Sequence, residues 1–149
     1  MVESALLALV RELLGAQRSA VLATTQPGGQ PYLSLMAFAA TQDLKQLILA
    51  TERDTQKYAN LMAEPRVALL IDNRSNVPAD TEEAVAVTIL GRAAAALPRE
   101  RDNLLPLFLA KHPHLEAFAT SPTGSLITVQ VETYLVVQRF QEVREIRMT

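Results

Sequence analysis

The chain has 149 residues, of which 49% are hydrophobic and 20% are charged, so we expect one folded domain with a substantial core. It contains no cysteine and only two histidines, His112 and His114. This excludes a disulfide framework, a thiolate nucleophile and a zinc site with cysteine ligands. The five glycines form neither a dinucleotide-binding fingerprint nor a phosphate loop of the Walker type. We therefore expect a bound organic cofactor to supply any difficult chemistry.

The net charge of −2 and the pI near 5.7 do not favour binding to nucleic acid. No basic segment precedes the first apolar stretch, as one does in a signal peptide. No apolar run reaches the roughly 18 residues of a membrane span. The sequence therefore predicts a soluble cytoplasmic protein without a nucleic-acid or membrane partner.

Apolar periodicity in the first part of the chain predicts a helix, three strands and a second helix. The first helix covers 4–14 and the strands cover 20–24, 32–40 and 47–51. Ser4 is expected to cap the first helix and Gly15 to end it. Asp54 is expected to cap the second helix, which Pro65 ends. Both faces of the 32–40 strand are apolar, which predicts burial on both sides, as in a closed barrel.

The second part of the chain continues with strands and one long helical region. It has a strand at 66–72, a polar loop at 73–83, an apolar run at 84–95, helical spacing over 98–120, and strands at 125–132 and 134–140. Pro106 and Pro113 are expected to divide the helical region, so we interpret His112 and His114 as part of a surface break between two helices. Hairpin-length connections make most strand pairs antiparallel.

Residues 51–57 place hydroxyl, amide and cationic groups between a strand and the start of a helix. A helix N-terminus has free backbone N–H groups that favour an anion, and Arg53 and Lys57 could add charge-assisted hydrogen bonds. Lys57 is one of only three lysines in the chain. The same residue types also serve as ordinary helix caps and solvent-exposed side chains. The local pattern therefore leaves both an anion site and a plain cap open.

Short motifs follow one another in a fixed order between residues 16 and 95. They are RSAVLAT at 18–24, QPYLS at 30–34, LAT at 49–51 followed by Lys57, NL at 60–61 with EPRVAL at 64–69, and LGRA at 90–93. This order resembles the pyridoxamine-phosphate-oxidase-like family of FMN-binding split-barrel proteins. The resemblance implies a mainly β fold in one domain over residues 1–149. The expected architecture is a six-stranded antiparallel Greek-key split β-barrel flanked by helices.

The resemblance also implies where FMN would bind. The strand around 34–37 would lie along the isoalloxazine ring, 50–51 would meet the ribityl–phosphate end, and 55–57 would hold the phosphate, with Arg53 as a further candidate. The implied cofactor-binding residues are Ser34, Leu35, Met36, Ala37, Ala50, Thr51, Arg53, Thr55, Gln56 and Lys57. The implied assembly is a homodimer with the cofactor in the groove between subunits, acting on a small-molecule substrate.

Three departures from the family pattern narrow the expected activity. Vitamin B6 oxidases of this family have arginine where this chain has Ser34 and Gln56, and they end in a tail that contains tryptophan, which this chain lacks. The resemblance thus implies an FMN-dependent oxidoreductase that moves hydride or electrons between a donor, such as a reduced nicotinamide, and a small substrate other than a B6 vitamer. No side chain is an obvious catalytic acid or base. Two alternatives stay open: a non-catalytic module that binds or senses flavin or haem, and a deazaflavin-dependent reductase.

Overall fold

The computed structural model describes residues 3–139 and 141–148. Its strands are β1 (Ser19–Thr25), β2 (Pro31–Ala40), β3 (Gln46–Glu52), β4 (Arg66–Asp72), β5 (Ala86–Ala95), β6 (Gly124–Gln138) and β7 (Glu142–Arg147). Its helices are α1 (Ala5–Ala16), α2 (Gln56–Ala63), α3 (Asp80–Glu83), α4 (Pro98–Lys111), the 3-10 helix η1 (Pro113–Leu115) and α5 (Glu116–Ala119). The first helix and the first five strands begin and end within two residues of their predicted bounds.

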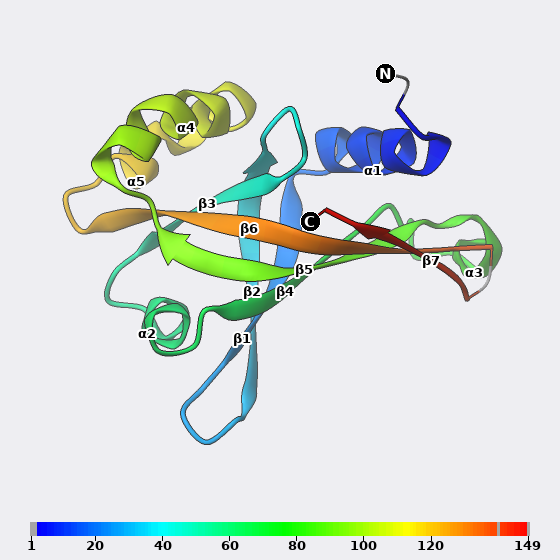
Figure 1. The fold of residues 1–149 in the computed structure, drawn as a ribbon, viewed down its shortest axis with the longest axis horizontal. Helices are drawn as coiled ribbons and strands as arrows, with labels where there is room; N and C mark the ends of the chain where they lie inside the picture. The colour runs from blue at the N-terminus through cyan, green and yellow to red at the C-terminus, as the bar shows by residue number, and fades with distance from the viewer. Residues whose placement is uncertain (1–2, 140, 149) are drawn as a thin grey trace.

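Six strands close into an antiparallel barrel in the order β3-β2-β1-β4-β5-β6, and β3 pairs with β6 to complete the ring. The fourth strand returns beside the first, so the order β4-β1-β2-β3 is that of a Greek key. Strand β7 pairs with the second half of β6, beyond the part of β6 that pairs with β3. Figure 1 shows α4 and α5 beside the β3–β6 side of this barrel, α1 at another side, and the β1–β2 hairpin extending away from the body. The predicted split barrel flanked by helices is confirmed.

The core has two parts on either side of the barrel wall. Inside the barrel, the large buried side chains include Tyr134, Phe38 and Leu22. A second cluster joins Ala39 of β2 and residues of β3 to α4, α5 and the start of β6. Strand β3 is therefore buried on both faces, and α4 and α5 have a fixed place beside it.

Strand β2 is buried on both sides only in its second half, so the prediction for its first half is wrong. Leu33 is 66% exposed and Leu35 is 74% exposed, whereas Phe38 and Ala39 are buried. The physical reason is coverage, because α4 packs against the second half of β2. The outward side chains of the first half have no helix over them in the part of the chain that is described.

Strand β6 is one long strand where the sequence predicted two. Glu132 has no partner on β5, because the register shifts between Leu90 and Gly91, so a β-bulge lies at this point. The bulge interrupts the alternation of side chains, which is why the sequence pattern breaks there. Gly91 has little room for a side chain, because an added Cβ would lie 2.3 Å from the carbonyl oxygen of Gln130. Phe140, the last residue of the predicted 134–140 strand, lies outside the described residues.

Three other boundaries predicted from the sequence are wrong. Helix α1 continues through Gly15 to Ala16. Helix α4 continues through Pro106. Proline has no N–H to donate to the carbonyl oxygen four residues earlier, but Pro106 lies on the solvent-exposed side of the helix, where water can donate to that oxygen instead. The predicted 73–83 loop contains α3, and the carboxylate of Asp80 accepts hydrogen bonds from the backbone N–H groups of 75–77. By contrast, α4 ends just before Pro113, as predicted.

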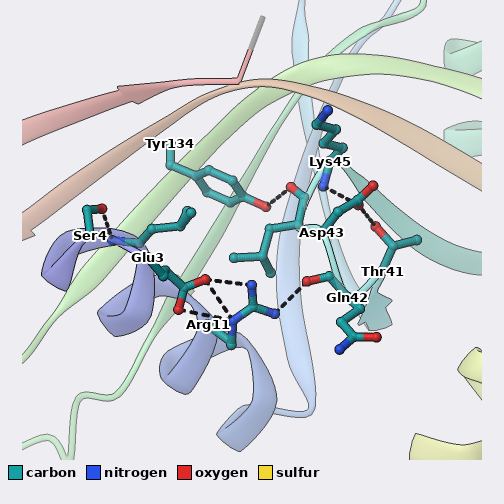
Figure 2. A network of polar contacts seen from close by, with 10 residues as sticks. Glu3, Ser4, Arg11, Thr41, Gln42, Asp43, Lys45 and Tyr134 are labelled. Atoms are coloured by element: carbon teal, nitrogen blue, oxygen red, sulfur yellow. Dashed lines mark hydrogen bonds and ion pairs between the residues drawn. The ribbon is translucent and has the colours of Figure 1, made fainter. Parts of the chain in front are cut away.

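The turn between β2 and β3 is held against α1 and β6, as Figure 2 shows. Arg11 on α1 donates to the carbonyl oxygen of Gln42 and forms an ion pair with Glu3 at 2.6 Å. The buried hydroxyl of Tyr134 donates to the carbonyl oxygen of Leu44 at 2.7 Å, and burial raises the pKa of Tyr134 so that it keeps its proton. These contacts hold the closed end of the β2–β3 hairpin in place.

Candidate functional site

The two strands β2 and β3 separate from one another at the end away from their turn. They pair only where residues 38–40 of β2 face residues 47–49 of β3. The other edge of β2 pairs with β1 over its first seven residues. Over 31–37 the edge of β2 that faces β3 therefore has no strand partner among the described residues. Alternate residues of an antiparallel strand direct their backbone N–H and C=O groups to opposite edges, so about every second residue of this stretch presents unpaired polar groups beside a gap in the barrel wall.

A cavity of about 210 Å³ lies at this gap. It brings together five of the ten residues that the sequence predicted for the cofactor. They are Leu35, Met36, Ala37, Ala50 and Lys57. Ser34 precedes them on β2 and does not line the cavity. The opposite wall comes from Phe108 of α4, Leu115 of η1 and Phe118 of α5.

The sequence pattern did not assign this opposite wall to the site. Phe108 and Phe118 are spaced as helical core residues, and that spacing carries no sign of a ligand. Only the packing of α4 and α5 on β3 brings them to the cavity. Each wall is thus mainly apolar, and Lys57 is the charged side chain among the cavity residues.

The turn between β3 and α2 begins the helix one residue later than predicted. Thr55, not Asp54, is the N-cap, and its hydroxyl oxygen accepts a hydrogen bond from the N–H of Tyr58 at 3.3 Å. The same hydroxyl donates to the carbonyl oxygen of Glu52 at 2.9 Å, and it lies 3.3 Å from the hydroxyl of the buried Thr51. Both hydroxyl groups are therefore committed to the turn itself, and they set its shape.

Helix α2 presents its N-terminus beside the cavity. The N–H groups of Gln56 and Lys57 have no protein partner in the described residues, as expected for the first turn of a helix. The half-buried Lys57 side chain likewise makes no ion pair or hydrogen bond within 3–139 and 141–148. One ammonium group and two backbone donors thus lie together where an anion could bind.

Two predicted phosphate ligands have other contacts. Gln56 donates through its side-chain amide to Asn60 at 2.8 Å, and the buried Asn60 donates in turn to the hydroxyl of Thr24. Arg53 donates to the carbonyl oxygens of Pro122 and Gly124 at 2.7 and 2.8 Å. Arg53 therefore ties the turn to the start of β6 and the residues just before it, and it does not line the cavity.

The C-terminal end of α4 is fastened to β2 by two adjacent side chains. The ammonium nitrogen of Lys111 lies 3.8 Å from the centre of the Phe38 ring and donates to the carbonyl oxygen of Leu14. Burial, with a smaller effect of Arg18, lowers the pKa of Lys111 to about 8. The Nε2 atom of His112 donates to the carbonyl oxygen of Phe38 at 2.7 Å. His112 is 1% exposed, so its predicted place in a surface break is wrong, and burial lowers its pKa.

Residues 6–138 match the family described as pyridoxamine 5'-phosphate oxidase. This match covers most of the chain, so the protein belongs to that family, as the order of its motifs indicated. No curated protein matches the sequence at a significant level.

Several solved structures share the fold. A haem-binding protein from Mycobacterium smegmatis has a TM-score of 0.85 and 17% identity, over 99% of this chain and 60% of that chain. General stress protein 26 from Bacillus anthracis has a TM-score of 0.74 and 17% identity, over 97% and 100%. A FAD-binding protein from Mesorhizobium loti has a TM-score of 0.67 and 23% identity, over 90% and 94%. At these identities the likeness establishes the fold alone, and this chain spans only 60% of the haem-binding protein.

Two further properties concern membranes and metals. No helix within the described residues combines the length and the apolar character needed to cross a bilayer. The described residues also contain no group of three or more His, Asp or Glu side chains placed to hold a metal ion.

Proposed function

We propose that this protein binds FMN in the gap between β2 and β3, with the ring along residues 34–37 and the phosphate at the N-terminus of α2. One observation carries this proposal. The unpaired backbone edge of β2, two apolar walls and the Lys57 ammonium group all meet at one cavity. The membership of the chain in its family gives independent support.

The ring end of the cavity fits an isoalloxazine. A flavin ring has apolar faces and a polar edge of nitrogens and carbonyl oxygens. The faces would pack between Leu35 and Ala50 on one side and the aromatic residues Phe108 and Phe118 on the other. The polar edge would bond to those backbone groups of residues 34–37 that point away from β1, and these bonds would orient the ring and tune its potential.

The phosphate end requires a cation and several donors, because a phosphate monoester carries nearly two negative charges at neutral pH. Lys57 supplies the ammonium group, and the N–H groups of Gln56 and Lys57 supply donors at the positive end of the helix dipole. Thr51 and Thr55 would act indirectly, by fixing the turn that places these donors.

Bound FMN would supply transfer of hydride or electrons between a donor, such as a reduced nicotinamide, and a small substrate. The chain itself would bind and orient the ring and exclude water from its faces. A flavin phosphate has a cation and backbone donors available at the N-terminus of α2, whereas Met36 is the only side chain, among the described residues that line the cavity, of a type common as a haem iron ligand, so we propose a flavin in preference to haem. Oxidation of a B6 vitamer is not proposed, because the chain has no tryptophan and has Ser34 and Gln56 at the positions discussed above.

We also propose that a second copy of the chain completes the site. The outward side chains of β2, β1, β4 and β5 form two cross-strand rows, Leu35–Val21–Leu70 and Leu33–Ala23–Ala68–Leu90. An apolar surface of this kind is typical of an interface. The cavity of about 210 Å³ in one chain is smaller than the usual range of about 300–1,000 Å³ for small-molecule sites. A partner seated on the rows, which include the cavity residue Leu35, would supply the missing wall.

The flavin proposal is tested by comparing FMN with riboflavin, which lacks the phosphate. Lys57→Gln removes the ammonium group, so we expect FMN to bind about tenfold more weakly or worse, with riboflavin almost unaffected. Lys45→Gln is the matched control, because Lys45 is an exposed lysine in the β2–β3 turn. Titration with flavin fluorescence measures both affinities. An equal loss of FMN and riboflavin affinity would remove Lys57 from the phosphate site, and a wild-type chain that binds neither flavin would refute the proposal.

The dimer proposal is tested at a residue of the rows that lies outside the cavity. Leu33→Glu places a charge on the proposed interface, so we expect monomers where the wild type is a dimer in analytical ultracentrifugation. Val143→Glu is the control, because Val143 is 60% exposed on β7 and lies outside the rows. A monomeric wild type, or a Leu33→Glu variant that stays dimeric, would contradict the proposed interface.

A further inference from the structure

A chain of hydrogen bonds runs from the first turn of α2 into the barrel. The side-chain amide of Gln56 donates to Oδ1 of Asn60 at 2.8 Å, and Nδ2 of Asn60 donates to the hydroxyl oxygen of Thr24 at 3.0 Å. Asn60 is 0% exposed and Thr24 is 2% exposed. The Thr24 hydroxyl lies 3.5 Å from the carbonyl oxygen of Tyr32, which is opposite Thr24 on β2. The chain therefore joins the helix beside the candidate phosphate site to the two strands beside the candidate ring site.

These bonds give α2 a second point of attachment to the barrel. At the start of the helix, the Thr55 hydroxyl donates to the carbonyl oxygen of Glu52 at the end of β3. About one turn later, Asn60 donates to β1. A helix attached only at its start can tilt about that point, whereas a contact with a second strand removes this freedom. The unpaired N–H groups of Gln56 and Lys57 therefore keep one direction relative to the barrel.

Strand β1 also determines where the ring-binding edge of β2 lies. The two strands pair from Ser19 opposite Ala37 to Thr25 opposite Pro31. Among the described residues, β1 is the strand partner of 31–37 of β2, because β3 pairs only with 38–40. The bond between Asn60 and Thr24 thus fixes the helix that carries the anion-binding groups to the strand that holds the free edge of β2.

The polar character of this contact indicates a need for precise orientation. The neighbouring Leu61 of α2 is packed in the apolar core of the barrel, and an apolar side chain in place of Asn60 would avoid the cost of burying an amide. Hydrogen bonds, unlike apolar contacts, fix the direction of the groups that they join. Gln56 satisfies the buried carbonyl oxygen of Asn60, so its amide is engaged in this network.

We propose that Gln56, Asn60 and Thr24 are positioning residues, which hold the phosphate-binding turn of α2 in register with the ring-binding edge of β2. This inference rests on the proposed function and deepens it, because it explains how one chain aligns the two ends of the cofactor. Loss of the network leaves the β1–β2 ladder and the contacts of the ring in place, while the phosphate loses its aligned donors. The network therefore favours FMN over riboflavin.

The experiment compares the affinities of the full chain for FMN and riboflavin by flavin fluorescence. Thr24→Val removes the hydroxyl with little change in volume, so we expect the preference for FMN over riboflavin to fall about tenfold. Thr24→Ser keeps the hydroxyl and should keep the preference. Thr128→Val is the matched control, because Thr128 is also a buried threonine whose hydroxyl donates to a backbone carbonyl, and it does not line the cavity.

A double-mutant cycle separates a positioning role from a merely structural one. If the network aims Lys57 and the helix donors at the phosphate, Lys57→Gln should cost less FMN affinity in the Thr24→Val variant than in the wild type. Independent losses that simply add would show that Thr24 only stabilises the fold. Circular dichroism checks that each variant is folded. If Thr24→Val does not fold, Gln56→Ala at the exposed end of the network takes its place in both measurements, with the same expected results.

An unchanged preference for FMN in Thr24→Val, or an equal fall in Thr24→Ser or Thr128→Val, would overturn the positioning role. Hydrogen exchange of the flavin-free chain tests the attachment of α2 without the cofactor. The backbone N–H groups of Asn60 and Leu61 should exchange faster in Thr24→Val than in Thr24→Ser, and equal exchange would refute the attachment. A wild type that binds neither flavin would instead refute the proposed function, so the two failures are distinguishable.

Discussion

Tyr134→Phe removes one hydroxyl group from the barrel core and leaves the ring in place. The Tyr134 side chain is completely buried, and its hydroxyl donates to the carbonyl oxygen of Leu44 at 2.7 Å. The variant creates no large cavity but leaves that buried carbonyl without its donor, which costs about 1–3 kcal/mol of unfolding free energy. For a domain of this size each kcal/mol lowers Tm by about 2–4 °C, so we expect a fall of roughly 2–12 °C.

The assay for this prediction is thermal unfolding followed by circular dichroism, with urea unfolding as a second measurement. Tyr58→Phe is the matched control, since the Tyr58 hydroxyl makes no hydrogen bond with the part of the chain that is described. The Tm of the Tyr58→Phe variant should stay close to that of the wild type. If Tyr134→Phe were as stable as the wild type, the hydrogen bond to Leu44 would not help to hold the closed end of the β2–β3 hairpin.

Two further predictions concern packing and pH. Gly91→Ala should lower the free energy of unfolding by at least the 1–3 kcal/mol typical of an overpacked core, roughly 3 kcal/mol or more, because the new Cβ would lie 2.3 Å from the backbone oxygen of Gln130. Gly15→Ala is the control, because a Cβ added at this helical residue would have no atom within 4 Å. It should leave the unfolding free energy unchanged or raise it in urea unfolding. An equal loss of stability in both variants would contradict the steric explanation for Gly91. Burial lowers the pKa of His112 in the folded state, so the unfolded chain binds the proton more readily, and stability should fall as the pH drops below about 6.5. His112→Gln should make Tm less dependent on pH between 7 and 5, whereas a slope equal to that of the wild type would show that another group is responsible.

The sequence predicted the barrel strands well because their signals are local. Residues such as Val21 and Leu22 alternate between the two faces of β1, and the Pro-Gly turn at 27–28 separates two β-rich runs. The turn at 51–57 was also visible, because a strand is followed at once by cap residues and a helix. Five of the predicted cofactor residues consequently meet at one cavity.

The parts that the sequence did not predict depend on tertiary contacts. Glu132 interrupts the alternation in β6 because of a bulge opposite Gly91, and no local pattern separates a bulge from a strand end. Strand β7 carries mainly charged residues, as an edge strand can. Phe108 and Phe118 reach the cavity only because α4 and α5 pack on β3. His112 is buried through its contact with Phe38, 74 residues away in the chain.

The identity of the bound cofactor tests the central claim most directly. The full chain is made in its native host, the bound small molecule is released by denaturation, and its mass and absorption spectrum are measured. We predict FMN, close to one molecule per chain, from a yellow protein. A deazaflavin, haem, or a colourless protein that retains no flavin after saturation with FMN would contradict the claim that the gap between β2 and β3 is an FMN site.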